Sequence, residues 1–163
     1  MLADASKGIE LLASDVRESI LQNLAARFRL YHLPMPERLV LDSADAKAAA
    51  NALGSRQFEG IVCDVPCSGS GTWARTPEAC YFFQLDTLEA YTNRQLSILK
   101  NAANYLQMGG RIIYITCSVF RAENEDVINA ISAEAGLAIE SYQLINGISI
   151  AADSLFVAIL RRA

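Results

Sequence analysis

Two cysteines stand directly behind apolar runs in this sequence, at positions where a thiol could do chemistry. Cys67 follows the run that ends at Asp64, in DVPCSGSG, and Cys117 follows the run GGRIIYIT. A cysteine thiolate is both a nucleophile and a metal ligand. Because the carboxyl ends of parallel strands meet at one edge of a sheet, two thiols behind two strands predict a single site.

The surrounding residues argue against several kinds of site. A metal site is disfavoured because Cys63 and Cys67 have no paired ligand, and the only histidine, His32, lies elsewhere, where we expect it at the surface. A catalytic Cys–His pair is disfavoured for the same reason. The sequence holds neither a G-x-x-x-x-G-K-[ST] phosphate loop nor a G-x-S-x-G nucleophile elbow, so nucleotide hydrolysis and serine-hydrolase chemistry lack support.

Short apolar bursts alternate with amphipathic segments along the whole chain. This alternation predicts an α/β fold with a mostly parallel sheet and crossover helices, in one domain over residues 1–163. The expected strands are residues 9–13, 39–41, the run ending at 64, 111–116, 139–144 and 155–160. The expected helices are residues 16–31, 45–54, 86–106 and 122–136. We expect Gly54 to cap one helix and Gly109 with Gly110 to stop another.

Acidic residues also follow the expected strands. Ligands of open parallel sheets bind beyond the carboxyl ends of the strands, where Asp15, the pair Asp42 and Asp45, and Asp64 are found. A carboxylate after the second strand of such a sheet can accept from both hydroxyls of a ribose, a role that suits Asp15. The alternative for Asp15 is that of a helix N-cap.

The composition is that of an ordinary globular domain. The chain has 163 residues, of which 52% are hydrophobic, and its four cysteines are too few for a disulfide scaffold. We therefore expect reduced thiols in a soluble, cytoplasmic protein, and no apolar stretch approaches the roughly 20 residues of a membrane span. With a net charge of -4, any contact with nucleic acid must be a local patch or come from another domain.

Other side chains near the cysteines have two possible roles. Arg75 and Arg121 either belong to a local nucleic-acid patch or are ordinary solvated charges. We expect Cys63 and Cys80 to be buried as small apolar residues. A third group either packs in the core, which is the first expectation, or offers a stacking surface. This group consists of Trp73, Tyr81, Phe82 and Phe83.

Taken together, the two cysteine segments resemble two motifs of one enzyme family. DVPCSGSGTWARTPE and TCSVFRAENEDVI are similar to the fourth and sixth motifs of the Fmu/Sun-type RNA 5-methylcytosine methyltransferases, which read D-A-P-C-S-G and T-C-S followed by E-N-E. The resemblance extends to LLASDV, LDSADA, NRQLSILKNAANYL and ADSLFVAILRR, which match further segments of the family in the same order. It covers essentially the whole chain.

The resemblance implies a function and a division of labour. It implies a Rossmann-like fold that uses S-adenosylmethionine to methylate carbon 5 of a cytosine in rRNA or tRNA, in a single-stranded or loop region. By the same resemblance Cys117 is the nucleophile that adds to carbon 6, and Cys67 assists the breakdown of the adduct. Asp64 is similar to the family acid that bonds the ring nitrogen or amino group of the cytosine.

The cofactor contacts follow from the same resemblance. Asp15 is expected to hold the ribose of S-adenosylmethionine, and Asp45, rather than Asp42, the amino group of its adenine. Asp64 and Pro66 are expected to complete the cofactor site. No metal is implied.

One departure from the family pattern concerns function. The first motif of the family, a glycine-rich loop that holds the methionine end of the cofactor, should precede Ile9 and is absent. We therefore expect a C-terminal part of the catalytic domain, without its first strand, that self-associates through exposed sheet edges. The alternative is a truncated, non-catalytic relative that serves as an RNA- or protein-interaction domain. A nicotinamide-linked oxidoreductase lacks its glycine fingerprint here.

Overall fold

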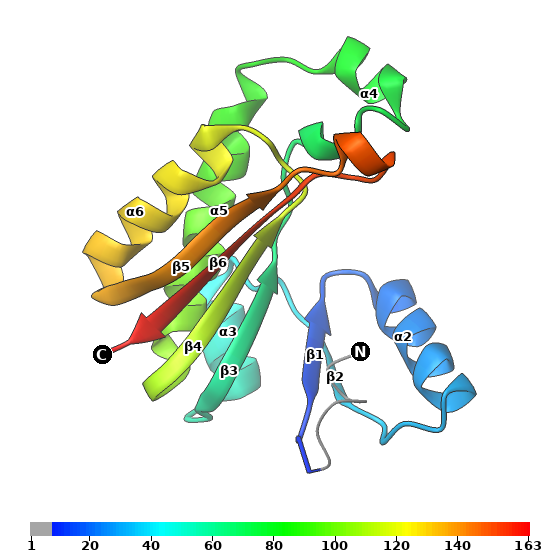
Figure 1. Ribbon diagram of the computed structural model, residues 1–163. Coiled ribbons are helices and arrows are strands. Elements are labelled where there is room, and N and C mark those ends of the chain that lie inside the picture. Colours follow the sequence, from blue (N-terminus) through cyan, green and yellow to red (C-terminus); the bar gives the residue numbers. More distant parts are fainter. Residues whose placement is uncertain (1–7) are drawn as a thin grey trace. The chain divides into compact units, whose positions relative to one another are not determined.

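The computed structural model describes residues 8–163 (Figure 1). Residues 1–7 of the predicted domain lie outside the described residues. The chain divides into two compact units, unit 1 up to Gly54 and unit 2 over Ser55–Ala163. That the whole chain forms one domain stays a prediction.

Unit 1 contains a strand–helix–strand unit. β1 (Leu12–Asp15) and β2 (Glu37–Val40) pair in parallel, and α2 (Glu18–Leu30) connects them. One face of α2 is apolar at helical spacing, and the side chains buried on it are Leu21, Ala25 and Phe28. β1 begins later than the expected strand at residues 9–13, because Ile9 is half-exposed and pairs with no neighbouring strand.

Helix α3 (Ala46–Leu53) closes unit 1 and is capped at both ends. Asp45 accepts hydrogen bonds from the backbone N–H groups of Lys47 and Ala48, at 2.9 and 3.0 Å. These bonds satisfy donors that the first helical turn leaves unpaired. At the other end Gly54 has a φ of 58°, which confirms the predicted glycine cap.

Unit 2 is built on a four-stranded sheet in the order β3–β4–β6–β5 (Figure 1). The strands are β3 (Phe58–Asp64), β4 (Leu106–Thr116), β5 (Leu137–Ile145) and β6 (Leu155–Arg162). β3 and β4 run parallel, whereas β6 is antiparallel to both β4 and β5. The fold is α/β as predicted, but the sheet is mixed, so the prediction of a mostly parallel sheet is wrong.

The connection between β5 and β6 explains the mixed sheet. Residues 146–154 contain only the short helix η3 (Ile148–Ile150). A parallel crossover needs about a dozen residues or more, usually including an α-helix. With so short a connection the chain can only return antiparallel, and β6 does so between β4 and β5.

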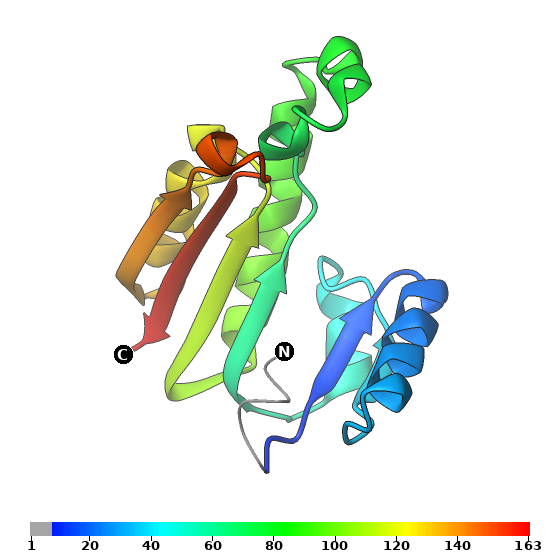
Figure 2. The same cartoon turned by 45° about the vertical axis from the view of Figure 1, so that its right-hand side comes forward.

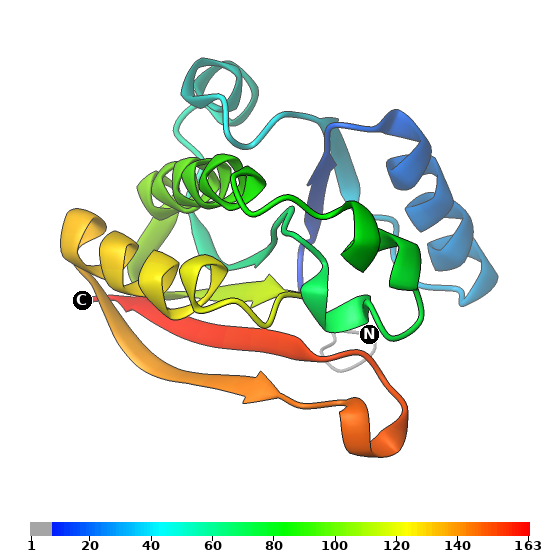
Figure 3. The same cartoon turned by 90° about the horizontal axis from the view of Figure 1, so that it is seen from above.

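Two helices cover one face of this sheet. α5 (Thr87–Asn104) and α6 (Glu125–Ala135) lie side by side against it, as seen from above in Figure 3. The core between helices and sheet is apolar, and its fully buried members include Leu99, Ile112, Tyr114, Ile128, Ile131, Phe156 and Leu160. Packing of the two helices on the sheet fixes the directions of β3 and β4. It thereby fixes where the loops that follow these strands begin.

The start of β4 differs from expectation. α5 ends at Asn104 and β4 begins at Leu106, so Gly109 and Gly110 do not stop the helix but lie inside the strand. The pairing with β3 is irregular there, and Gly109 has a φ of 77°. A β-carbon on Gly110 would lie 2.9 Å from a backbone oxygen of β3. These glycines therefore serve a bulge in the sheet rather than a helix end.

Short elements lie beyond the carboxyl ends of β3 and β4. They are η1 (Ser70–Thr72), α4 (Pro77–Phe82) and η2 (Arg121–Glu123). Figure 2 shows α4, in green, past the tips of the β3 and β4 arrows. This end of unit 2 carries both cysteine segments.

Candidate active site

The two cysteines meet at the carboxyl ends of β3 and β4. Asp64, the last residue of β3, pairs with Ile115 of the parallel strand β4, so the loops after both strands begin at the same edge. Cys67 follows in one loop and Cys117 in the other, and their sulfur atoms lie 3.3 Å apart. Both thiols are free, because a disulfide bond would bring the sulfurs to about 2.05 Å.

The contact between the sulfurs separates the pKa values of the two thiols. The hydrogen bond from Cys67 lowers the pKa of Cys117 to about 7, although burial and the charges of Asp64 and Asp153 act in the opposite direction. The same hydrogen bond, followed by burial, raises the pKa of Cys67. The pair therefore carries its first negative charge on Cys117, while Cys67 stays a protonated thiol at neutral pH.

Asp64 is the acidic neighbour of this pair. Its residue is exposed, yet the loss of water on its protein side raises the pKa of its carboxyl group. Its charge in turn raises the pKa of Cys117. A polar ligand that reached the sulfur of Cys117 would thus also come under the influence of this carboxyl group.

A glycine joins the two cysteine loops. The N–H of Gly71 donates to the carbonyl oxygen of Cys117 at 2.8 Å, and its own carbonyl accepts from the N–H of Ser154 at 2.9 Å. A β-carbon at this position would overlap the carbonyl of Ser154 and lie 3.0 Å from that of Cys117. Gly71 therefore allows three chain segments to approach closely.

A buried acid, Glu123, lies against both loops. Its side chain is fully buried and accepts from the N–H of Ser68, at 2.8 Å, and from the amide of Gln95, at 3.1 Å. The hydroxyls of Ser68 and Ser118 each donate to it at 2.6 Å. Gln95 also donates to the carbonyl of Pro66 at 2.9 Å. Sequence reasoning assigned Glu123 no role, although the E-N-E resemblance marked its position.

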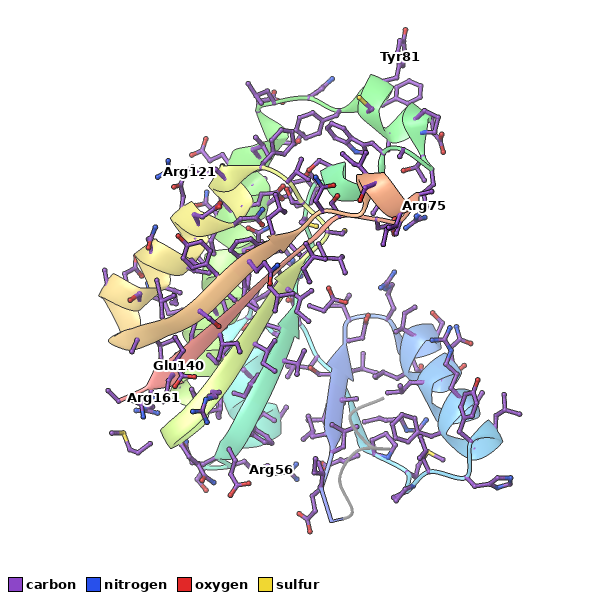
Figure 4. All side chains as sticks on the ribbon, in the orientation of Figure 1. Arg56, Arg75, Tyr81, Arg121, Glu140 and Arg161 are labelled. Atoms are coloured by element: carbon purple, nitrogen blue, oxygen red, sulfur yellow. The ribbon has the colours of Figure 1, made fainter. Side chains whose placement is uncertain are left out.

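The aromatic residues near Cys67 divide into two groups. Trp73 and Phe83 pack with Phe120, with ring centroids 5.1 to 5.8 Å apart. Tyr81 and Phe82 are 83% and 75% exposed, so the expected core packing is wrong for these two. In Figure 4 Tyr81 projects outward from α4.

The exposure of these residues follows from the position of α4. Its six residues lie past the sheet, where nothing in unit 2 covers their outer face. For Tyr81 and Phe82 a stacking role stays open.

The two arginines near the cysteines are both ion-paired and exposed. Arg75 contacts Asp153 at 2.8 Å, and Arg121 contacts Asp126 at 3.0 Å. The side chains of the arginines are 64% and 78% exposed, and both are labelled in Figure 4. Their charges face solvent at the end of unit 2 that carries the cysteines.

The two predicted cofactor acids belong to unit 1. Asp15 is the last residue of β1 and accepts from the backbone and the guanidinium of Arg17, at 2.8 and 3.2 Å. Burial raises the pKa of Asp15, but the bonds and charge of Arg17 outweigh it and leave the pKa below its usual value. Arg17, not Asp15, occupies the N-cap position of α2, so the N-cap alternative for Asp15 is wrong. Asp45 uses one carboxylate oxygen to cap α3.

The remaining cysteines and the histidine lie apart from this centre. Cys63 is buried in β3 as expected, and burial raises its pKa to about 12. Cys80 is exposed on α4, so the expectation that it is buried is wrong, for the same reason as for Tyr81. His32 is exposed, as predicted.

Residues 8–163 contain neither a metal-binding cluster of side chains nor a membrane-spanning helix. No group of three or more His, Cys, Asp or Glu side chains in this range is arranged to hold a metal ion. Nor does any helix in the described part of the chain combine the length and the apolar character needed to cross a membrane.

The fold matches solved methyltransferase structures. NSun6 from Pyrococcus horikoshii, solved with SFG, superposes with a TM-score of 0.81 at 20% identity, over 94% of this chain and 41% of that one. A methyltransferase homologue from the same organism gives 0.77 at 19% identity, over 94% of this chain and 53% of the other. At these identities the likeness shows a methyltransferase fold and no more.

Sequence comparison defines the family. The model described as "16S rRNA methyltransferase RsmB/F" matches residues 2–154, so the chain belongs to that family. Ribosomal RNA small subunit methyltransferase B of Pseudomonas syringae is 39% identical over 101 residues, 60% of this chain and 22% of that protein. The tRNA (cytosine(34)-C(5))-methyltransferase of Drosophila melanogaster is 38% identical over 84 residues, 52% of this chain and 11% of that protein. The chain thus spans about a fifth or less of these relatives.

Proposed function

We propose that this chain carries the reaction centre of an S-adenosylmethionine-dependent RNA 5-methylcytosine methyltransferase. The observation that carries the proposal is the 3.3 Å contact between the sulfurs of Cys67 and Cys117, beside Asp64, in a member of the RsmB/F family. A thiolate in contact with a thiol suits a reaction in which a covalent bond to the base is first made and later broken.

The chemistry of cytosine explains the need for a thiolate. The thiolate of Cys117 adds to carbon 6, and the electron pair of the C5=C6 bond makes carbon 5 an enamine carbon. When bound, S-adenosylmethionine would supply the methyl group to that carbon and would leave as a neutral thioether. The proton on carbon 5 then passes to a base, the C5=C6 bond re-forms, and the C6–S bond breaks to release the thiolate.

Cys67 and Asp64 have separate supporting roles in this scheme. Cys67 assists the last step: once Cys117 is bonded to carbon 6 and carries no charge, the neighbouring Cys67 thiol can ionise and take the proton from carbon 5, which a serine hydroxyl of much higher pKa cannot do. Asp64 bonds the ring nitrogen or the amino group of the cytosine, which offsets charge as the adduct forms and favours cytosine over uracil.

The acids of unit 1 suit the adenosine half of the cofactor. Asp15 ends a parallel strand, and its carboxylate is partly exposed, as an acceptor for two ribose hydroxyls would be. Asp45 caps α3 through Oδ1, which leaves Oδ2 to accept from an adenine amino group. Asp64 and Pro66, in unit 2, stay predicted cofactor residues.

The substrate we propose is a cytosine in single-stranded or loop regions of rRNA or tRNA. The matched relatives are named for small-subunit rRNA and for tRNA, which supports both classes. A base must leave its stack to reach a sulfur on the protein, and extrusion is cheapest where the base is unpaired. Because the reaction needs reduced thiols, we also propose a cytoplasmic location.

The cysteine assignment is tested with C117S and C67S variants of the longest natural chain that contains these residues. Each is incubated with S-adenosylmethionine and either transcribed 16S rRNA or tRNA. C117S should lose methyl transfer and covalent RNA capture, because a hydroxyl of much higher pKa cannot replace the thiolate. C67S should still form the methylated adduct but release it slowly, so a protein–RNA band should persist on a denaturing gel.

Three results would count against the proposal. A persistent adduct with C117S and none with C67S would reverse the two roles. An adduct with neither variant, and no methyl transfer by the unaltered chain, would exclude the covalent mechanism. RNA binding without either activity would instead favour the alternative, a non-catalytic relative that serves as an interaction domain.

A further inference from the structure

We propose that Glu123 is a positioning residue, whose buried carboxylate holds the Cys67 loop and the Cys117 loop at the spacing that keeps the two sulfurs in contact. The catalytic meaning of this inference rests on the proposed function. The spacing itself can be measured without RNA or cofactor, so the two can fail separately.

One carboxylate links the residues that follow both cysteines. Ser68 comes directly after Cys67, and Ser118 directly after Cys117. Their hydroxyls both donate to the same oxygen, Oε2 of Glu123, at 2.6 Å each. The other oxygen, Oε1, accepts from the backbone N–H of Ser68 at 2.8 Å. Each cysteine is therefore one residue from an anchor on a shared group.

The hydrogen-bonding partners of Glu123 are all donors. Two hydroxyls, one backbone N–H and the amide of Gln95 point at its two oxygens. Burying a polar side chain is costly unless its acceptors are satisfied, and here four donors satisfy those of Glu123. An apolar side chain could fill the space but could not join the two loops.

The hydroxyl of Ser118 also makes hydrogen-bonding contacts with groups other than Glu123. It lies 3.1 Å from the hydroxyl of Ser70 and accepts from the N–H of Phe120 at 3.0 Å. Ser70 in turn accepts from the N–H of Val119 at 2.9 Å. Residues that follow each cysteine are thus tied into one network that centres on the carboxylate.

Glu123 does not itself reach a substrate. Its side chain has no exposed surface, whereas Cys67 and Cys117 are each partly exposed. It acts through the cysteine loops, which distinguishes it from Asp64.

The test uses E123Q in a chain that also carries C80S, which removes the exposed thiol. A glutamine keeps the shape but replaces one acceptor oxygen by an N–H₂ donor. Turned toward the N–H of Ser68, this group sets donor against donor; turned toward the two serine hydroxyls, it removes the acceptor that they share. Phenylarsine oxide, which must bond two adjacent thiols at once, reports the spacing of the pair. We expect its affinity to fall about tenfold or more in E123Q.

A second readout is the pH profile of Cys117 alkylation by iodoacetamide. Only the thiolate reacts, so the midpoint follows the pKa of Cys117, which is about 7 when Cys67 donates to it. The charged and titratable groups that act on this sulfur are Cys67, Asp64, Asp153 and Arg75. If E123Q separates the sulfurs, the lowering effect of Cys67 weakens and the midpoint moves to higher pH.

Two matched variants separate positioning from general stability. Y114F removes a different buried hydrogen bond, from the Tyr114 hydroxyl to the backbone oxygen of Glu123 at 2.6 Å, and leaves the carboxylate intact. E134Q removes an exposed charge of α6, paired with Lys100. Both should keep the arsenical affinity and the alkylation midpoint. If E123Q does not fold, S118A replaces it in both measurements. This variant removes the bond from the Ser118 hydroxyl to Glu123, which is one of the two hydroxyl bonds that join the loops.

The inference is overturned if folded E123Q, or S118A in its place, keeps both the affinity and the midpoint of the parent chain. It is also overturned if Y114F changes them as much. Should E123Q separate the sulfurs as expected while the parent chain captures no RNA, the positioning role stands and the proposed function fails.

Discussion

Cys67 and Cys117 are the same residue type, and only their surroundings make them unequal. The hydrogen bond between them lowers the pKa of Cys117 and raises that of Cys67. The charges of Asp64 and Asp153 oppose a thiolate on Cys117, so the bond from Cys67 is what outweighs them. The pair therefore combines a thiol of lowered pKa with the hydrogen-bond donor that lowers it.

This asymmetry predicts the effect of C67A on the pH dependence of alkylation. Below its pKa Cys117 is an unreactive thiol, and its reactivity appears as pH rises through the pKa, which is about 7. C67A removes the donor and leaves the opposing effects, so the midpoint should rise to about 8.5 or above. Mass mapping of the alkylated peptides would measure it.

C67S is the matched control, since a hydroxyl still donates to the thiolate. Its midpoint should stay closer to that of the unaltered chain. A C67A midpoint that remained near that of the parent would mean that Cys67 does not set the reactivity of Cys117.

At the scale of elements, the candidate site lies in the loops that follow β3 and β4. The helices α5 and α6 fix the directions of these strands by packing on the sheet, but the contacts that hold the loops together are made by loop residues. Gly71 touches the Cys117 loop on one side and the Ser154 segment on the other. Its role follows from close approach and not from an unusual φ.

G71A should therefore be one of the more damaging single-methyl changes in unit 2. The added carbon overlaps the carbonyl of Ser154, so the segments must separate. We expect a loss of about 1 to 3 kcal/mol in the free energy of unfolding. Urea denaturation would measure that loss, and phenylarsine oxide binding should weaken in parallel.

G60A provides the comparison within the same unit. A β-carbon on Gly60 would meet its nearest neighbour, a backbone oxygen of Arg111, at an ordinary 3.9 Å. This variant should keep the stability of the parent to within about 0.5 kcal/mol, as surface changes usually do. Equal effects of G60A and G71A would contradict the packing argument.

At the scale of the whole molecule, strand edges in each unit are unpaired among residues 8–163. In this range β1 pairs only with β2, and β3 pairs only with β4. The β3 edge includes the exposed side chain of Val62, which is 47% accessible. Unpaired edges with exposed apolar residues are templates for pairing with another chain.

We expect the 163-residue chain to self-associate through such edges, and V62K to reduce the association. A lysine on an edge strand opposes pairing, because its charge would have to be buried. Light scattering after gel filtration, over a range of concentrations, would give the mass of each species. M108K places the same charge on another exposed apolar residue away from the edge and should change nothing. A parent chain that stayed monomeric throughout would contradict the prediction.

Much of the architecture was readable from local pattern. The apolar periodicity of residues 16–31 and 122–136 predicted helices that the structure contains as α2 and α6. The glycine after α3 predicted its cap. Such features depend on neighbours within a few residues, and the sequence states them directly.

The predictions that were wrong depended on contacts between residues far apart in the sequence. The antiparallel course of β6 follows from the short connection at 146–154, which was visible but outweighed by the strand–helix alternation. The role of Gly109 and Gly110 follows from pairing with β3, and the exposure of Cys80, Tyr81 and Phe82 from the absence of any layer over α4. Composition alone does not distinguish a core aromatic from one on an uncovered helix.

For the site, residue types and order were sufficient to identify two cysteines behind two strands and the family they resemble. Only the tertiary structure decided that the sulfurs lie 3.3 Å apart and that Cys117 has the lowered pKa. Only it placed the carboxylate of Glu123 between two serines fifty residues apart in the chain. Hydrogen bonding and burial act through space over a few ångströms, and those distances exist only once the chain has folded.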